Sequence, residues 1–179
     1  MVLLPTWDFI ITLAFVVTTV AALLLGRERI SVVLIAMYVG LAVAGELGDA
    51  FFNFLQGSTL LAGYIWVKSN LSVFMVKTIV FTAIVVFLVS RGEFTAPQDI
   101  SSRGLASVLV TAAYGFFLAG LLVTSFIFFL AQESQAAMFA ASPLAEKVMG
   151  YRIWWLLVPL LIMVGSSMFR ARRQPAPTS

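Results

Sequence analysis

The sequence contains no cysteine and no histidine, and each absence removes a class of chemistry. Without cysteine there is no disulfide, no thiol nucleophile, no thiolate metal site and no cysteine-held cluster. Without histidine there is no imidazole to bind haem or zinc, and no histidine base to activate a serine. We therefore predict that the protein is not an enzyme and has no catalytic residues, no metal and no cofactor.

Charged residues are also scarce, at 11% of the 179 residues, whereas soluble domains carry about 25%. Hydrophobic residues make up 61% of the chain, and the mean hydropathy is +1.05. No basic face with interleaved aromatic residues lies outside the apolar segments, so nucleic acid is not an expected partner. The composition predicts an integral membrane protein whose main partner is the lipid bilayer.

Five apolar segments are long enough, or nearly so, to cross a bilayer as helices, which takes roughly 20 residues. They cover residues 7–25, 30–55, 71–89, 105–131 and 153–169. The sequence therefore predicts an all-α fold, a polytopic transmembrane bundle in one domain. This domain covers residues 1–169, and residues 170–179 form a tail that is first basic and then disordered. An alternative has four spans, with the last apolar segment lying in the membrane interface.

Basic residues divide unevenly between the two sides that five spans create. One side holds seven of them: Arg27, Arg29, Arg91, Arg103, Arg170, Arg172 and Arg173. The other side holds Lys68, Lys147 and Arg152. Because loops rich in lysine and arginine stay in the cytoplasm, we expect the N-terminus outside and the C-terminus inside. All four tryptophans then fall near the outer boundary, as an aromatic belt requires: Trp7, Trp66, Trp154 and Trp155.

Small residues recur every four positions in three of the segments. The stripes are Ala14, Thr18, Ala22 and Gly26; Ala36, Gly40, Ala44 and Gly48; and Ser107, Thr111, Gly115 and Ala119. Residues four apart share a helix face, and small side chains let helices approach closely in lipid. We therefore predict helix packing at Gly40, Ala44, Gly48, Gly115 and Ala119. The four-residue turn "GRER" predicts that the first two helices form an antiparallel hairpin.

Lys77 lies in the apolar stretch "SVFMVKTIVF", with no other charge within eight residues on either side. At about 1.5 Å per helical residue, Lys77 lies about 9 Å below the outer boundary and Glu46 about 6 Å below it. Asp49 lies close to the boundary itself. Because an unpaired charge in a bilayer is costly, we predict a candidate intramembrane charge pair. Lys77 is its cation, and the carboxylate is that of Glu46 first and Asp49 second.

Two other interpretations of Lys77 stay open. Its aliphatic stem can carry the ammonium group outward to the lipid headgroups, or the charges can belong to an ion or proton path. A proteolytic role is not expected for Glu46 and Asp49. The stretch "GELGD" does not match the Gly-x-Gly-Asp motif of intramembrane aspartyl proteases, and no second aspartate lies at a similar depth in another segment.

Several stretches together form a familiar outline. They are the start "TWDFIITLAF", with Asp8 ahead of an aromatic residue, the turn and helix "GRERISVVLIAMYVGLAVAG", the segment "SRGLASVLVTAAYGFFLAGLLV", and the Ser-Pro-Leu at 142–144. This outline resembles the colicin V production protein family of small bacterial inner-membrane proteins. The chain departs from that family where "GRERIS" lacks a second glycine, and in its extra C-terminal segment.

The resemblance implies a non-enzymatic role in envelope homeostasis or in the export of a secreted peptide. Such a protein would act through helix–helix partners, either other membrane proteins or further copies of itself. The alternative is a small transporter or channel component, such as the substrate-capture subunit of a vitamin transporter. The sequence does not identify a small-molecule substrate for it.

The absence of cysteine makes the topology testable with single engineered cysteines. We expect Ser179→Cys to resist a membrane-impermeant maleimide in intact cells and to react after lysis, because five spans place it in the cytoplasm. Thr6→Cys, on the opposite side, is the control and should react in intact cells. Labelling of Ser179→Cys in intact cells would contradict the five-span topology.

Overall fold

The computed structural model describes residues 6–57, 72–91 and 105–171, and this part of the chain forms seven helices and no strand. The helices are α1 (Trp7–Leu25), α2 (Arg27–Gly57), α4 (Val73–Arg91), α5 (Leu105–Phe129), α6 (Gln132–Ala141), α7 (Pro143–Gly150) and α8 (Arg152–Ala171). The predicted all-α fold is confirmed. Four helices, α1, α2, α4 and α5, are long and apolar enough to span a membrane, and α7 with α8 makes a fifth if this bent pair counts as one span.

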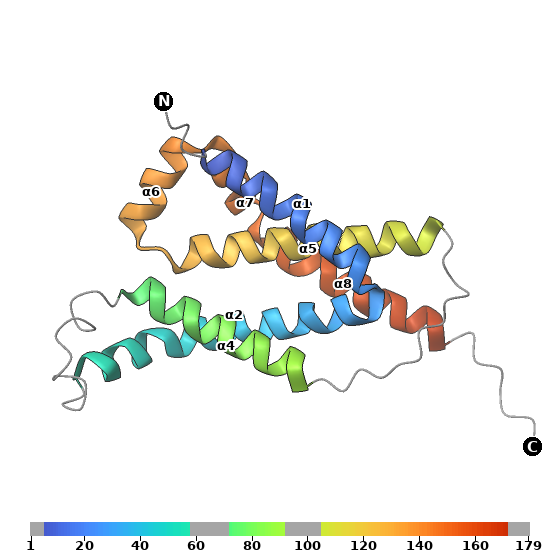
Figure 1. Ribbon diagram of the computed structural model, residues 1–179, viewed down its shortest axis with the longest axis horizontal. Coiled ribbons are helices and arrows are strands. Elements are labelled where there is room, and N and C mark those ends of the chain that lie inside the picture. The colour runs from blue at the N-terminus through green and yellow to red at the C-terminus, as the bar shows by residue number, and fades with distance from the viewer. Residues whose placement is uncertain (1–5, 58–71, 92–104, 172–179) are drawn as a thin grey trace, which may run out of the picture.

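The long helices run between two ends of the bundle (Figure 1). One end, which we call the α6–α7 end, is where α1, α4 and α8 start and α2 and α5 finish. At the opposite end, the Gly26 end, Gly26 joins α1 to α2. The chain therefore crosses the bundle five times, and α1 starts at the opposite end from the one where α8 stops.

The bounds of four helices differ from the predicted spans. α1 occupies the predicted residues, but α2 extends beyond its span at both ends, and α4 lies two residues later than predicted. α5 ends two residues early, at Phe129, and α8 runs from Arg152 to Ala171, so it includes the first two residues of the predicted tail. No helix was predicted between the fourth and fifth spans, where α6 and α7 lie. The last apolar segment became α8, which packs along α5. The tail after residue 171 lies outside the described residues.

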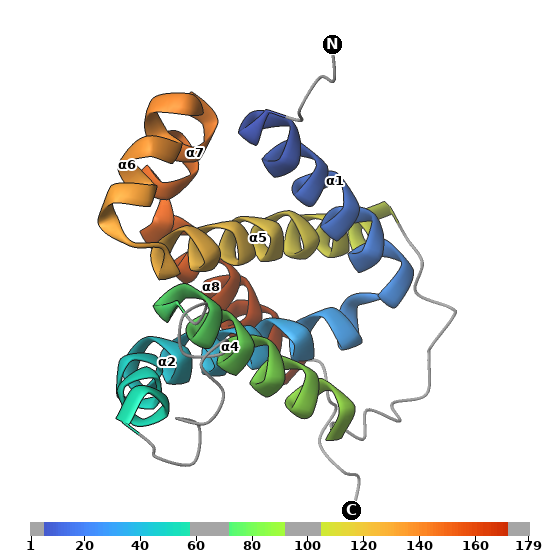
Figure 2. The same ribbon diagram turned by 60° about the vertical axis from the view of Figure 1, so that its left-hand side comes forward.

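The first two helices run in opposite directions, as predicted, but they do not pack along each other as a hairpin, and the turn between them is a single residue (Figure 1). Gly26 has a φ of 80°, which favours glycine, and its N–H donates to the carbonyl oxygen of Ala22 to end α1. α2 begins at the next residue, Arg27. From this point the two helices diverge (Figure 2): α1 packs mainly along α5, and α2 packs mainly along α4.

α5 is the central helix of the bundle, and glycine lets α1 approach it closely. In α5 61% of the most apolar stretch is buried, against 11% in α1 and in α4. A Cβ atom added at Gly115 would lie 2.5 Å from the Cβ of Ala22 and 2.9 Å from the Cα of Thr19. Ala119, one turn further along α5, is fully buried. The predicted stripes of α1 and α5 therefore face each other.

The predicted stripe of α2 lies against α4. Ala36 and Ala44 are buried, and so are the two glycines of the stripe. A Cβ atom at Gly40 would lie 3.1 Å from Val85 Cγ2 and 3.3 Å from the carbonyl oxygen of Phe81. Phe81 is itself buried and belongs to the main core cluster. The α2–α4 contact is thus also built on small residues.

Trp155 does not belong to the expected outer belt. Its ring lies over Gly120 of α5, where an added Cβ atom would come within 2.3 Å of the ring, and its indole N–H donates to the carbonyl oxygen of Val148 at 2.8 Å. Trp7 and Trp154, by contrast, are 46% and 59% exposed at the α6–α7 end. Trp66 lies outside the described residues.

α8 is tied to α2 by a hydrogen bond near a proline. Pro159 is fully buried inside α8 and has no N–H, so this part of the helix lacks one backbone donor. The hydroxyl group of Tyr38 on α2 donates to the carbonyl oxygen of Leu156, in the turn that precedes Pro159. Such bonds between helices help to hold a bundle together in lipid.

Matched glycine variants test whether close approach holds the bundle together. We expect Gly115→Ala to lower the free energy of unfolding in detergent by about 1–3 kcal/mol, because the added methyl group would overfill the α1–α5 contact. Gly45→Ala is the control. Nothing lies within 4 Å of a Cβ at Gly45, so this change should be neutral or stabilise α2 by up to about 1 kcal/mol. Equal effects of the two changes would contradict the packing role of Gly115.

Candidate functional site

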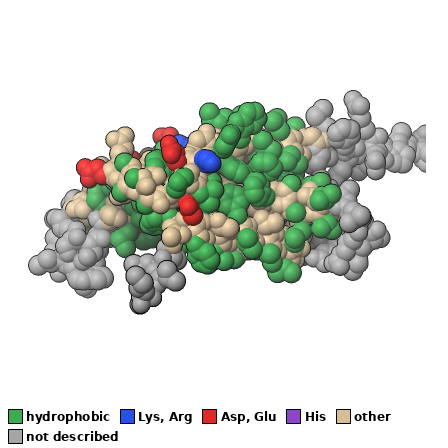
Figure 3. Space-filling view, turned by 90° about the horizontal axis from the view of Figure 1, so that it is seen from above, with side chains coloured by type: hydrophobic (Ala, Val, Ile, Leu, Met, Phe, Trp, Pro, Cys, Tyr) green, Lys and Arg blue, Asp and Glu red, His purple; other side chains and the backbone are tan. Residues whose placement is uncertain are grey.

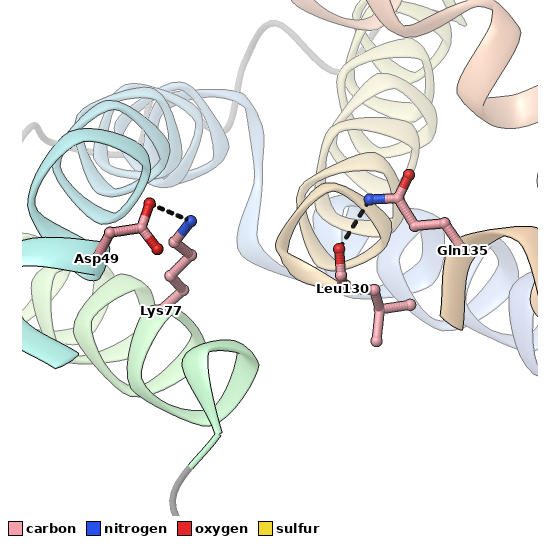
Figure 4. Close-up of polar contacts among 4 residues, drawn as sticks. All are labelled: Asp49, Lys77, Leu130 and Gln135. Carbon is pink, nitrogen blue, oxygen red and sulfur yellow. Dashed lines mark hydrogen bonds and ion pairs between the residues drawn. The ribbon is translucent and has the colours of Figure 1, made fainter. Parts of the chain in front are cut away.

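The candidate site is an ion pair between α2 and α4. The ammonium nitrogen of Lys77 lies 2.9 Å from Oδ2 of Asp49 and donates a hydrogen bond to it (Figure 4). Lys77 lies in the second turn of α4, and Asp49 lies in the last third of α2. The two helices run in opposite directions, so both residues lie toward the α6–α7 end.

Gly48 makes room for the lysine. A Cβ atom at Gly48 would lie 2.4 Å from Cγ of Lys77 and 3.1 Å from its Cε. The aliphatic stem of Lys77 therefore lies across the backbone of α2 at the last small residue of the buried stripe. The position predicted to serve helix packing also seats the charged side chain.

The order of the two carboxylates is the reverse of the prediction. Successive residues on an α-helix are rotated by about 100°, so Asp49 lies about 100° from Gly48, where the lysine stem crosses. Glu46 lies about 160° from Gly48, nearly on the opposite side of α2, and it is exposed. Depth alone favoured Glu46, but the direction in which each carboxylate points decides the partner.

The two members of the pair differ in exposure. The side chain of Lys77 is 15% exposed and that of Asp49 is 61% exposed. The stem of the lysine is thus covered, while its ammonium group reaches an open carboxylate. Exposed pairs of this kind contribute little to stability, typically about 0.2–1 kcal/mol. Asp49 thus neutralises the charge of Lys77 near the α6–α7 end, and neither residue of the pair lies at the centre of the bundle.

A second polar contact joins Asp8 to Ser142, two residues quoted above for the family resemblance. The hydroxyl of Ser142 donates to Oδ1 of Asp8 and accepts from the backbone N–H of Ala145, so it caps α7. Ser142 is fully buried. The pattern of serine followed by proline at the first helical position predicts such a cap, but no sequence signal connects it to a residue 134 positions earlier.

Most of the visible charge collects at the same end of the molecule. Seen from above, the charged side chains gather where α6 and α7 lie, and the rest of the described face is largely apolar (Figure 3). The guanidinium group of Arg152, at the start of α8, lies 3.8 Å above the ring of Phe128. The amide of Gln135 on α6 donates to the carbonyl oxygen of Leu130 at 2.8 Å (Figure 4).

The buried hydroxyl groups of α5 bond to their own helix. Thr111 donates to the carbonyl oxygen of Ser107, and Thr124 donates to that of Gly120. Ser125 donates to the carbonyl oxygen of Leu121 at 2.7 Å. Each of these bonds returns to the preceding turn, so the hydroxyls in the middle of the bundle are used by the fold. The sequence predicts Ser107 and Thr111 only as members of a packing stripe, and it assigns no role to Thr124 and Ser125.

One hydroxyl group differs from these. The Oγ1 atom of Thr78, next to Lys77 in α4, is buried and has no hydrogen-bond partner among the described residues. A threonine in a spanning helix normally donates to the carbonyl oxygen one turn earlier. Sequence analysis did not single out this residue, because its neighbour Lys77 carried the stronger signal.

The described residues include no group of three or more acidic side chains placed to hold a metal ion. Comparisons of the chain with family models, with curated proteins and with solved structures find no match.

Double-mutant cycles test the assignment of the pair. We expect Lys77→Met and Asp49→Asn to couple by about 0.5–1 kcal/mol in thermal unfolding in detergent, because Asp49→Asn removes the partner of a lysine whose side chain is mostly covered. The matched cycle pairs Lys77→Met with Glu46→Gln. It should be additive within about 0.3–0.5 kcal/mol, because Glu46 points away from the lysine. Coupling to Glu46 in place of Asp49 would contradict the structure.

Proposed function

We propose that this protein is a non-enzymatic, multi-pass protein of a bacterial inner membrane that acts through helix–helix partners. Its role would be envelope homeostasis or the export of a secreted peptide, as the resemblance to the colicin V production family implies. Its N-terminus would face outward and its C-terminus the cytoplasm. The coarser conclusion, a multi-pass helical membrane protein, rests on the four or five apolar helices themselves.

The observation that carries the proposal is the use of polar groups inside the bundle. The three buried hydroxyls of α5 bond to their own backbone, and the charge pair lies toward one end. The outward faces of α1 and α4 are apolar. For example, Leu24 is 83% exposed and Ile79 is 63% exposed. Among the described residues, few polar groups at the centre of the bundle are left for chemistry, which supports a role through contacts at the outer helix faces, with lipid or with protein, over a role in catalysis.

Site-specific photocrosslinking in cells tests for such partners. A photoreactive amino acid in place of Leu24 or Ile79 is expected to form protein adducts, because both positions point out of the bundle. The same group in place of Tyr114, which is 1% exposed, is the control and should form none. If neither exposed position yields a protein adduct, the outer faces of α1 and α4 do not contact helix partners, which would contradict the proposal for these faces.

The physiological role has its own readout. A strain that lacks the protein is expected to have a more permeable envelope or to secrete less of the exported peptide, and the wild-type chain should restore either property. Normal permeability together with normal secretion in that strain would contradict the proposed role and leave the membrane fold unaffected.

A transporter component is the second candidate, and Thr78 is the observation that favours it. A polar atom without a partner in a spanning helix is the kind of group that a polar solute could use. Thr78→Val removes the hydroxyl at nearly constant volume. It should leave the partner contacts of the first candidate unchanged, whereas it should lower uptake if the protein carries a solute. Unchanged uptake in a strain that depends on the protein for it would exclude Thr78 from such a path.

A further inference from the structure

α2 is longer than a bilayer crossing requires. Its 31 residues make a helix about 46 Å long, whereas the hydrocarbon core of a bilayer is about 30 Å thick. About ten residues are therefore in excess. Arg29 is exposed at the start of α2, in the position where a basic residue marks a membrane boundary, so the excess lies at the α6–α7 end.

The outward face of α2 shows where the crossing ends. Ile35, Val39 and Ala42 are exposed on this face and are apolar. On the same side one turn further along lies Glu46, also exposed, followed by Asn53. A helix face that changes from apolar to polar in this way has left the hydrocarbon. The residues from Glu46 to the end of α2 form what we call the α2 extension, residues 46–57.

The α2 extension carries large apolar side chains on a different face. Leu47, Phe51 and Phe54 are 56%, 48% and 68% exposed, and the two phenylalanine rings lie 6.4 Å apart. Their spacing of four and three residues places them on one side of the helix. Around the helix, Asp49 lies about 140–160° from these three side chains and Asn53 about 100–160° from them, so the extension is amphipathic.

We infer that the α2 extension rests on the lipid, with Leu47, Phe51 and Phe54 in the boundary between the headgroups and the acyl chains. Three observations favour a lipid surface. The apolar stripe follows directly on a membrane-crossing stretch of the same helix, and aromatic side chains are typical of this boundary. The ion pair of Asp49 with Lys77 fixes the extension to α4 at this level. Helices that lie at the boundary are amphipathic in this way.

The charged residues of the α2 extension indicate which kind of lipid headgroup it can contact. Its only ionisable side chains are Glu46 and Asp49, and both lie on the polar side. Attraction between basic residues and anionic headgroups, which strengthens many interfacial helices, is absent from residues 46–57. Contact with the membrane therefore comes from apolar area alone, and it should not require anionic lipid. This inference rests on the proposed membrane placement of the protein.

Single cysteines in this cysteine-free chain test the inference. Phe54→Cys and, one residue away on the polar side, Asn53→Cys are each labelled with an environment-sensitive fluorophore, and the protein is reconstituted into phosphatidylcholine vesicles. Phe54→Cys is expected to be quenched more strongly by lipid spin-labelled near the headgroup than by iodide in the water. Asn53→Cys should show the opposite ratio. Phe51→Cys serves as a second reporter on the apolar side.

The possible outcomes distinguish lipid, water and protein as the surroundings of the apolar side chains of the α2 extension. Quenching of Phe54→Cys and Phe51→Cys mainly by iodide would mean that the stripe faces water, and shielding from both quenchers would mean that a protein covers it. Either result overturns the inference. Val39→Cys, on the outward face of the crossing, should be quenched by lipid spin-labelled near the end of the acyl chain. If this lipid does not quench Val39→Cys, the membrane placement itself is overturned. If it quenches Val39→Cys but headgroup-labelled lipid does not quench Phe54→Cys, only the lipid contact of the extension is overturned.

Discussion

Close approach of helix backbones is the constraint on which the rest of this structure depends. Lipid is as apolar as leucine, so burying apolar side chains gives helices no reason to associate within a bilayer. Contact must come from short distances, and glycine supplies them. Gly115 allows α1 to pack closely against α5, and Gly40 allows α4 to pack closely against α2. Gly120 admits the indole ring of Trp155, which holds α8 and the end of α7 against the central helix.

The same packing determines what the polar groups can do. Once α5 is covered on several sides, its hydroxyl groups must find partners within the helix, and the preceding turn provides them. Groups that bond between elements are few in the described residues, and two of them fasten α7 and α8: Ser142 to Asp8, and Tyr38 to the carbonyl oxygen of Leu156. Polarity in the bundle therefore mainly fixes the register of helices.

Packing also selects the charged partner of Lys77. The lysine stem needs a place where it can cross α2, and Gly48 offers one. From that place the ammonium group reaches Asp49 and not Glu46. Gly48 therefore determines which of two carboxylates, only three residues apart, pairs with Lys77. The pairing depends on the direction in which each carboxylate points around the helix axis, and the depth of a residue along the helix does not give that direction.

The sequence by itself determined the class of the protein, its long helices and the small-residue stripes at which they meet. These follow from composition and from the periodicity of single segments, which are local properties. The tertiary structure alone decided that α1 packs on α5 in place of α2, that the ring of Trp155 packs over Gly120, and that Asp8 meets Ser142. Each of these depends on how one helix is rotated and placed against another. In lipid that placement is set by contacts over a few ångströms, and the sequence does not show which distant residues will make those contacts with each other.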